Sequence, residues 1–269
     1  MDKELSNVGF MEMLQWAGVL KAIVSSRYLS NYRDLFNLRH LVHRWCTATH
    51  TFFISCGEIT VTLEDVANQL NLPILRDVDP SGLELSLEEE VVETELKKRM
   101  SGNTKLLYWV SSSSKIFVAI HRAAFVTFWL YKFIFGSHPD YALKPLYFLL
   151  AIKIYVRVSL PLAPMFLGYL YVQLDIVWSN EDQASSCHIV TTSVHSTILQ
   201  HLLYECCARH LAKCKPVCFA KKRYQSCLRF ITEFCGRFEF DFPLAFRWVG
   251  LKSIVHPTVE FFDKGVGFP

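Results

Sequence analysis

The sequence predicts a mainly α-helical protein with one small antiparallel β-hairpin near residues 52–61. Most of its apolar side chains recur at the three- and four-residue spacing of helices. The clearest alternating pattern of paired strands, interrupted by a glycine turn, lies at residues 52–61. Glycine is scarce, with 11 residues in 269, and neither GxGxxG nor GxxxxGK[ST] occurs. The sequence therefore predicts a helical domain without a glycine-rich nucleotide-binding loop.

The predicted hairpin turns at Cys56 and Gly57, where glycine provides the positive φ angle that such a turn needs. Cys56 is a poor first residue for a type I′ turn, so a bulged turn fits equally well. Apolar side chains of the two strands then lie on one face, because side chains alternate along a strand. The expected cross-strand pairs on this face are Ile54 with Ile59 and Phe52 with Val61. An isolated hairpin is only marginally stable in water, so we expect this face to pack against Trp45 and apolar helices.

A short helix is expected directly after the hairpin. Thr62 is a favourable N-cap residue, and Asp65 three residues later completes a capping box with the backbone amides. Pro73 ends the helix, because the residue before a proline is pushed out of the helical region. The apolar stripe of this helix consists of Leu63, Val66, Ala67 and Leu70.

Further helices are expected from apolar spacing and from start and stop residues. They cover residues 10–24, 32–45, 86–102, 115–135, 164–178, 194–206 and 224–235. The helix at 86–102 begins with a Ser86 cap and Glu89 and is charged on most faces, so we expect it on the surface. The helix at 115–135 is apolar on nearly every face and is expected at the centre of the core. Residues 152–158 alternate in character and are also compatible with a short strand.

The whole chain, residues 1–269, is expected to form a single domain. A serine run at residues 111–114 resembles a flexible connector, so any two subdomains are expected to meet near residues 101–114. The uncharged stretch Val158 to Leu174 has 17 residues and is interrupted by prolines. A membrane-spanning helix needs about 20 apolar residues. We therefore interpret this stretch as buried core and expect no membrane association.

The cysteine pattern indicates a reducing, intracellular compartment. Nine cysteines form an odd count, and the first residues lack the basic start and apolar run of a secretory signal. The densest group of candidate metal ligands is His201, Cys206, Cys207, His210, Cys214 and Cys218. Zinc modules usually contain C-x2-C pairs, and this spacing does not occur. We interpret the cysteines as apolar side chains and expect no metal and no other cofactor.

Several short motifs around the hairpin resemble the signature of the plant mobile domain. This domain is also called the aminotransferase-like domain of the MAIN and MAIN-like plant proteins and of related transposon-carried sequences. The motifs are LVHRW at Leu41–Trp45, HTF from His50, GE at Gly57–Glu58, TVTLEDV at Thr60–Val66 and LP at Leu72–Pro73. Phe125–Gly136 and Leu160–Leu167 resemble later apolar segments of the family. The resemblance covers residues 9–250, and Asn71 stands where the family often has glycine.

The resemblance implies a nuclear protein, with the cytoplasm as the alternative location. It implies roles in transposon silencing, gene regulation and meristem maintenance, carried out through protein–protein interaction. The implied partners include a phosphatase-like protein. Because related domains travel in transposons, the resemblance also implies that this chain is either transposon-derived or a captured host fragment.

No set of catalytic residues emerges from the sequence. Aminotransferase chemistry needs a Schiff-base lysine and a phosphate cradle for pyridoxal phosphate, and the lysines here lack such a context. The G-x-S-x-G motif of hydrolases and the protease triplet of retroelements are also missing. We therefore expect a protein that is not an enzyme and has no small-molecule substrate.

Nucleic-acid binding is the alternative function. Residues 206–232 contain seven basic and no acidic residues, whereas residues 77–95 contain eight acidic and no basic residues. Basic side chains neutralise phosphates and aromatic side chains stack on bases. A solvated basic face on a helix explains the same pattern. The candidate nucleic-acid-binding residues are Lys213, Lys215, Lys221, Lys222, Arg223 and Arg229.

Overall fold

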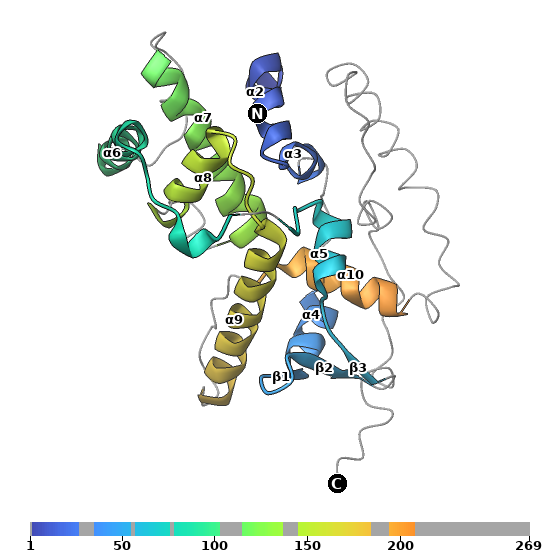
Figure 1. Cartoon of the computed structure of the whole chain (residues 1–269). Coiled ribbons are helices and arrows are strands. Elements are labelled where there is room, and N and C mark those ends of the chain that lie inside the picture. Colours follow the sequence, from blue (N-terminus) through green and yellow to red (C-terminus); the bar gives the residue numbers. More distant parts are fainter. Residues whose placement is uncertain are drawn as a thin grey trace. The chain divides into compact units, whose positions relative to one another are not determined.

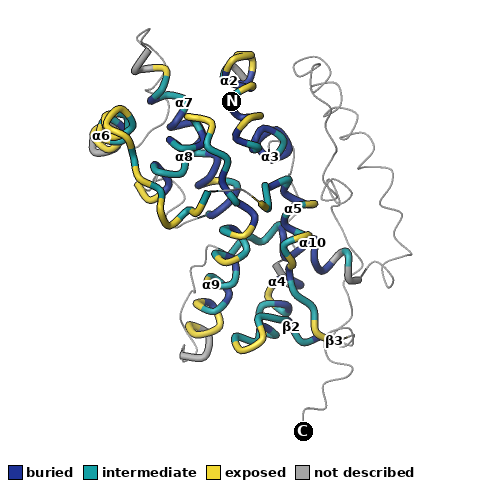
Figure 2. Tube along the Cα trace, in the orientation of Figure 1, coloured by how far each residue is buried: buried dark blue, intermediate teal, exposed yellow. Residues whose placement is uncertain are grey.

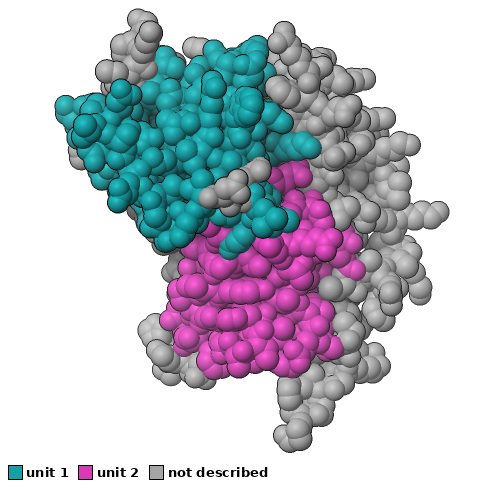
Figure 3. Space-filling view, viewed as in Figure 1, with its two compact units in different colours: residues 1–24, 72–164 teal, residues 25–71, 165–269 magenta. Residues whose placement is uncertain are grey.

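A computed structural model describes residues 2–26, 35–54, 57–75, 78–102, 115–136, 145–183 and 194–207 (Figure 1). These residues form helices and one small antiparallel sheet, which confirms the predicted fold class. The chain divides into two compact units (Figure 3). Unit 1 comprises residues 1–24 and 72–164, and unit 2 comprises residues 25–71 and 165–269. Residues 103–114 lie outside the described residues, so a boundary there stays a prediction.

The elements of unit 1 are mainly helical. They are α1 (Asp2–Leu5), α2 (Val8–Trp16), α3 (Leu20–Ser26, of which residues 25 and 26 belong to unit 2), the short helix η1 (Pro80–Gly82), α6 (Leu87–Gly102), α7 (Lys115–Trp129), the π-helix η3 (Leu130–Phe135), η4 (Pro145–Tyr147) and α8 (Phe148–Tyr155). Unit 2 contains the sheet. Its elements are α4 (Leu35–Val42), β1 (Trp45–Cys46), β2 (Thr51–Ile54), β3 (Gly57–Ile59), α5 (Leu63–Leu70), α9 (Leu162–Gln183, in unit 2 from Met165) and α10 (Ser196–Cys207).

The core of unit 1 forms where α6 and α8 pack on α7. Its buried side chains are Leu96, Ile120, Ala123, Ala124, Phe148 and Ile152. The segment Val118–Phe135 is long and apolar enough to cross a membrane by length and composition, and 67% of it is buried inside the protein. The core helix of a soluble protein passes the same test, so this finding carries little weight for a membrane. The predicted central position of the helix at 115–135 is confirmed.

The surface helix α6 is fixed to unit 1 at its first turn. The Ser86 amide donates to Glu89 Oε2 at 2.7 Å, and the Glu89 amide donates to Ser86 Oγ at 3.4 Å, which is the predicted capping box. Lys153 Nζ lies 2.6 Å from Glu89 Oε2, and both side chains are only 12% exposed. Burial opposes ionisation of Glu89, but hydrogen bonds from Lys153 and Ser86 outweigh it and lower the pKa of Glu89.

Several predicted helix boundaries are wrong. The helix expected at 10–24 breaks between α2 and α3, where Gly18 has a φ of 76°. The helix expected at 32–45 ends at Val42, since Trp45 belongs to β1. The short strand considered for 152–158 does not form over its first half, because α8 extends through Tyr155. A short apolar run fits both periods, so neighbouring contacts decide between them.

The two long helices that follow also differ from expectation. Pro164 is the third residue of α9 rather than its first, and α9 continues beyond Trp178 to Gln183. Proline is tolerated there because first-turn amides have no partner within the helix. The next helix, α10, begins at Ser196. The helix expected at 224–235 lies outside the described residues.

The sheet has one more strand than predicted and a different register. Its strand order is β1-β2-β3, with antiparallel pairs throughout. Phe52 pairs with Ile59 and Ile54 pairs with Gly57, so the expected pairing is wrong by two residues. Gly57 is the first residue of β3 and has the predicted positive φ, at 121°. A two-residue shift keeps each side chain on its face, so the apolar face is still buried.

The helix α5 begins and ends as its residue types dictate. The Asp65 amide donates to Thr62 Oγ1 at 3.1 Å and the Thr62 amide donates to Asp65 Oδ2 at 2.8 Å, which confirms the predicted capping box. At the other end Asn71 adopts a left-handed conformation, with φ of 54° and ψ of 32°. Asparagine tolerates this region better than most residues. Its Nδ2 also donates to Ser25 Oγ at 3.2 Å.

Replacing Asn71 separates the backbone effect from the hydrogen bond. Asn71→Gly removes the cost of the left-handed backbone while losing the bond to Ser25, so we expect the free energy of unfolding to change by less than about 1 kcal/mol. Asn71→Ala loses the bond and adds strain, so we expect a loss of about 1–2 kcal/mol. Urea unfolding measures both. Equal losses for the two variants would contradict the assigned role of the backbone.

Candidate functional site

The hairpin meets α9 in unit 2 through a group of aromatic and polar side chains. This Trp45 cluster consists of Trp45, His50, Phe52, Tyr171 and Asp175. Trp45 is 3% exposed and Phe52 is fully buried, and their ring centroids are 4.8 Å apart. The Trp45 ring also lies 5.5 Å from Tyr171 on α9. The cluster therefore joins strands β1 and β2 to residues more than a hundred positions later.

Asp175 provides the polar contacts of the cluster. The Trp45 indole Nε1–H donates to Asp175 Oδ1 at 2.7 Å. Asp175 Oδ2 lies 3.5 Å from His50 Nε2, and the two side chains are 35% and 45% exposed. Both carboxylate oxygens of Asp175 thus face the sheet. A charged acceptor makes the indole hydrogen bond stronger than one between neutral groups.

The backbone of His50 is held in an uncommon conformation. Its φ is 52°, in the left-handed region. Its amide donates to the Cys46 carbonyl at 2.8 Å, and its carbonyl accepts a 2.6 Å hydrogen bond from Thr60 Oγ1. The imidazole stacks on Tyr171, with centroids 5.1 Å apart and an interplanar angle of 18°. These contacts fix the position of the His50 ring in the loop between β1 and β2.

Tyr171 completes the connection between α9 and the sheet. Its hydroxyl donates to the Val61 carbonyl at 2.8 Å and lies 3.2 Å from Thr60 Oγ1. A histidine next to a carboxylate also occurs in catalytic triads, where a hydroxyl or thiol completes the set. Within the described part of the chain, the contacts of the His50 ring are with Asp175, Trp45 and Tyr171. These contacts fit a structural role, in which His50 helps to hold the hairpin against α9.

A second histidine lies in the interior of unit 2. His201 on α10 is fully buried, and its Nδ1 lies 3.1 Å from Gln69 Oε1 on α5. Burial, followed by the charge of His195, lowers the pKa of His201 to about 3. His201 is therefore neutral at physiological pH. Among the described residues, no group of three or more His, Cys, Asp or Glu side chains could hold a metal ion.

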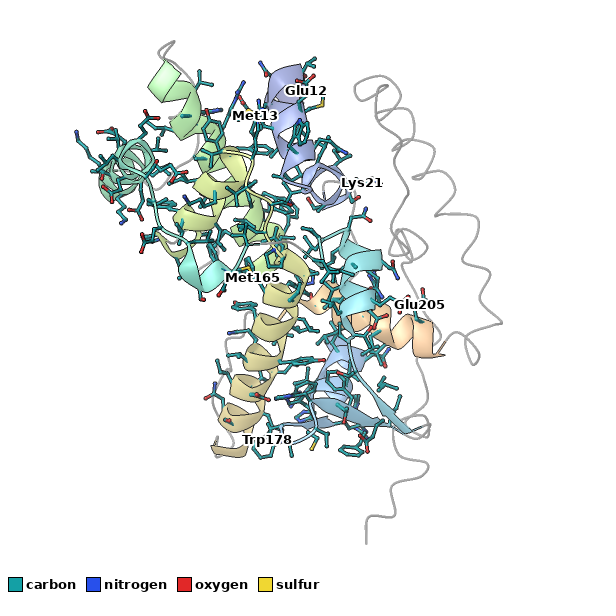
Figure 4. All side chains as sticks on the ribbon, in the orientation of Figure 1. Glu12, Met13, Lys21, Met165, Trp178 and Glu205 are labelled. Carbon is teal, nitrogen blue, oxygen red and sulfur yellow. The ribbon has the colours of Figure 1, made fainter. Side chains whose placement is uncertain are left out.

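The outward face of α9 exposes apolar side chains. Val172 is 54% exposed and Ile176 is 45% exposed, and Gly168 is exposed on the preceding turn. We name these three residues the α9 ridge. They share one face because they lie at i, i+4 and i+8. Exposed positions recur along α9 in Figure 2, and Met165 and Trp178 lie near opposite ends of its unit 2 part in Figure 4.

The sequence interpretation of this region is partly wrong. The stretch Val158 to Leu174 was expected to be buried core, but Gly168 and Val172 are exposed. The buried side chains of α9 in unit 2 are Phe166, Leu170, Leu174 and Val177. The i, i+4 spacing of Tyr171 and Asp175 indicates a shared helical face, but no pattern along the chain indicates that this face meets Trp45.

The candidate nucleic-acid-binding residues stay untested by the structure. Lys213, Lys215, Lys221, Lys222, Arg223 and Arg229 all lie within residues 208–269, outside the described residues. Three of the candidate metal ligands, His210, Cys214 and Cys218, lie there as well.

A family model of the plant mobile domain matches residues 18–256 of the chain. The chain belongs to the plant mobile domain family. The match contains the Trp45 cluster, the α9 ridge and the basic segment, and it identifies a family of plant domains associated with transposons. Neither a curated protein nor a solved structure matches the chain.

The buried histidine makes the stability of this plant mobile domain dependent on pH. Between pH 6.5 and about 3 the unfolded chain protonates His201, whereas the folded chain does not. The free energy of unfolding therefore falls as the pH falls through this window, by up to about 1.4 kcal/mol per pH unit from this group. Above pH 6.5 His201 is neutral in both the folded and the unfolded chain, so it does not lower the free energy of unfolding there.

His201→Asn keeps a polar group near Gln69 but does not titrate. Urea unfolding at a series of pH values should give a shallower pH dependence for His201→Asn than for the wild type. The comparison uses the slopes, so a uniform loss of stability in the variant does not affect it. Parallel curves would contradict a neutral, buried His201.

Proposed function

We propose that this plant mobile domain is a non-enzymatic protein interaction module whose contact surface includes the α9 ridge. The main support is the set of exposed apolar side chains on α9. Among the described residues of unit 2, the large apolar side chains with high exposure are Val172, Ile176 and Trp178. All three lie within two turns of one helix, whereas single exposed apolar residues are usually scattered. Their concentration on α9 favours a protein partner.

The chemistry of the ridge also favours a protein partner over a polar ligand. No charged side chain interrupts the row Gly168, Val172 and Ile176. Asp175, the nearest acid on the helix, is turned to the sheet by its hydrogen bond with Trp45. Interface centres are typically depleted in charge and rich in apolar side chains.

The polar groups of the Trp45 cluster support a role without catalysis. Asp175 accepts from Trp45 and faces His50, and Tyr171 donates to the backbone of Val61. These contacts fix the hairpin on α9. Groups engaged in this way stabilise the fold and are poorly placed to act on a substrate.

The resemblance to MAIN-like proteins supports a biological setting for this module. We place it in the nucleus, where it would act with protein partners, including a phosphatase-like protein, in transposon silencing, gene regulation and meristem maintenance. Family membership supports the link to transposons. The cytoplasm is the alternative location.

Nucleic-acid binding through residues 206–232 is the alternative proposal. Its support is the charge of this segment, with seven basic and no acidic residues. Binding to labelled DNA or RNA at physiological salt, abolished by charge reversal of Lys221, Lys222 and Arg223, would favour it. Binding that disappears at physiological salt would favour the interaction module.

The interaction module can be tested with variants of the α9 ridge. A double variant with Val172→Asp and Ile176→Asp places two charges at the centre of the apolar face. We expect it to capture at least about tenfold less of the partners retained by the wild type from plant nuclei, since a buried charge without a counterion is costly at an interface. Quantitative mass spectrometry measures the loss.

The matched control is Val91→Asp on α6, because Val91 is 51% exposed and belongs to unit 1. It should retain the wild-type partners. Circular dichroism and thermal unfolding identify any variant that fails to fold. An unchanged partner set for a folded Val172→Asp, Ile176→Asp variant would refute the role of the ridge.

A further inference from the structure

The start of α6 exposes an apolar side chain among carboxylates. Leu87, the first residue of the helix, is 82% exposed. Glu84, Glu88 and Glu90 are exposed around it, and α6 is largely exposed along its outer side (Figure 2). We name these four residues the α6 acidic face.

The carboxylates of this face are not used in the ion pairs of unit 1. In the ranges that the structure describes, the acids of α6 that form ion pairs are Glu89, Glu93 and Glu95. Their partners are Lys153, Lys97 and Lys98, respectively. The negative charge of the α6 acidic face is therefore available to another molecule.

The helix geometry places the apolar residue between two acids. Glu89 is turned to α8, where it contacts Lys153. Glu88 and Glu90 are each turned about 100° from Glu89, in opposite directions, and Leu87 is turned about 200°. Acids in a first turn stabilise a helix by themselves, but this effect does not explain a leucine exposed between them. An oppositely charged partner with an apolar side chain does.

The chain itself contains a segment of this complementary chemistry. Residues 208–232 contain seven basic residues and no acidic residue, whereas residues 77–95 contain eight acidic residues and no basic residue. Apolar rings, such as those of Phe219 and Tyr224, lie among the basic residues in the sequence. The segment directly follows α10, which ends at Cys207, and lies outside the described residues.

We propose that the α6 acidic face of one copy binds the basic segment, residues 208–232, of a second copy of this chain. Every copy carries both partners of the contact, so the chain associates with itself. Leu87 keeps its 82% exposure in the single chain, which leaves the face open to a second molecule. The proposal concerns a surface of unit 1 and does not depend on the α9 ridge.

The magnitude of surface electrostatics makes this association weak and dependent on salt. A single exposed ion pair contributes little, so several pairs and the burial of Leu87 act together. We expect a dissociation constant on the order of 10–100 µM at low salt. The Debye length falls from about 10 Å at 0.1 M salt to about 3 Å at 1 M salt. Association should therefore weaken at least about tenfold between about 0.05 M and about 0.5 M salt.

Sedimentation equilibrium of the purified full chain at low and high salt tests the proposal. The protein is first treated with nuclease, because nucleic acid bound to basic segments could join two copies. The wild type should associate reversibly at low salt. An acid-reversed variant, with Glu84→Lys, Glu88→Lys and Glu90→Lys, carries positive charge on both partners of the contact. It should associate at least about tenfold more weakly.

A charge exchange between two variants keeps the test independent of how well one variant folds. The base-reversed variant, with Lys221→Glu, Lys222→Glu and Arg223→Glu, should also fail to associate by itself. In an equimolar mixture with the acid-reversed variant, each altered surface meets an altered surface of opposite charge, and each native surface meets its native partner. The mixture should associate at least about tenfold more tightly than either variant alone.

The control is Val91→Asp, which changes the next turn of α6 without removing a negative charge. It should associate at low salt as the wild type does. Circular dichroism and thermal unfolding verify that each variant is folded, since lysines near a helix N-terminus oppose its dipole.

The outcomes separate this inference from the proposed function. A wild type that stays monomeric at low salt at all concentrations overturns the inference, as does a mixture of the two reversed variants that fails to associate. The double variant Val172→Asp, Ile176→Asp should associate normally at low salt. If it does and still loses its protein partners, both proposals stand. If it associates normally and keeps those partners, only the α9 ridge fails.

Discussion

The hydrogen bond between Trp45 and Asp175 anchors the small sheet of unit 2 to α9. It joins a strand residue to a helix residue 130 positions later, at 2.7 Å. Around it the rings of Trp45, His50 and Tyr171 stack, and the Tyr171 hydroxyl reaches the backbone after β3. A sheet of two- to four-residue strands has little stability of its own. Its attachment to α9 supplies the buried surface that it needs.

The same contact determines which face of α9 is exposed. Tyr171 and Asp175 face the sheet, and each following residue is turned by about 100° around the helix axis. Val172 and Ile176 therefore lie about 100° around the helix axis from Tyr171 and Asp175, respectively, and both are exposed. The contact with the hairpin therefore leaves the side of α9 that carries Val172 and Ile176 exposed. This links a structural cluster to the proposed interaction surface.

Local features of the fold were predictable from the sequence, whereas distant contacts were not. Thr62 with Asp65 and Ser86 with Glu89 form the predicted capping boxes, because caps depend on neighbouring residues. The hairpin face was also predictable, but its register was not, since a two-residue shift preserves the apolar pattern. The partnership of Trp45 with Asp175 and the exposure of Val172 depend on tertiary packing, which apolar spacing alone does not specify.

A double-mutant cycle between Trp45 and Asp175 measures how strongly this hydrogen bond couples the hairpin to α9. Trp45→Phe keeps an aromatic ring but removes the indole donor, and Asp175→Asn keeps the side-chain size but removes the charge. The free energies of unfolding of the wild type, the two single variants and the double variant give the coupling energy. A coupling of about 1–3 kcal/mol is expected for a hydrogen bond to a charged acceptor in a partly buried site. A coupling near zero would contradict the claim that this bond holds the hairpin on α9.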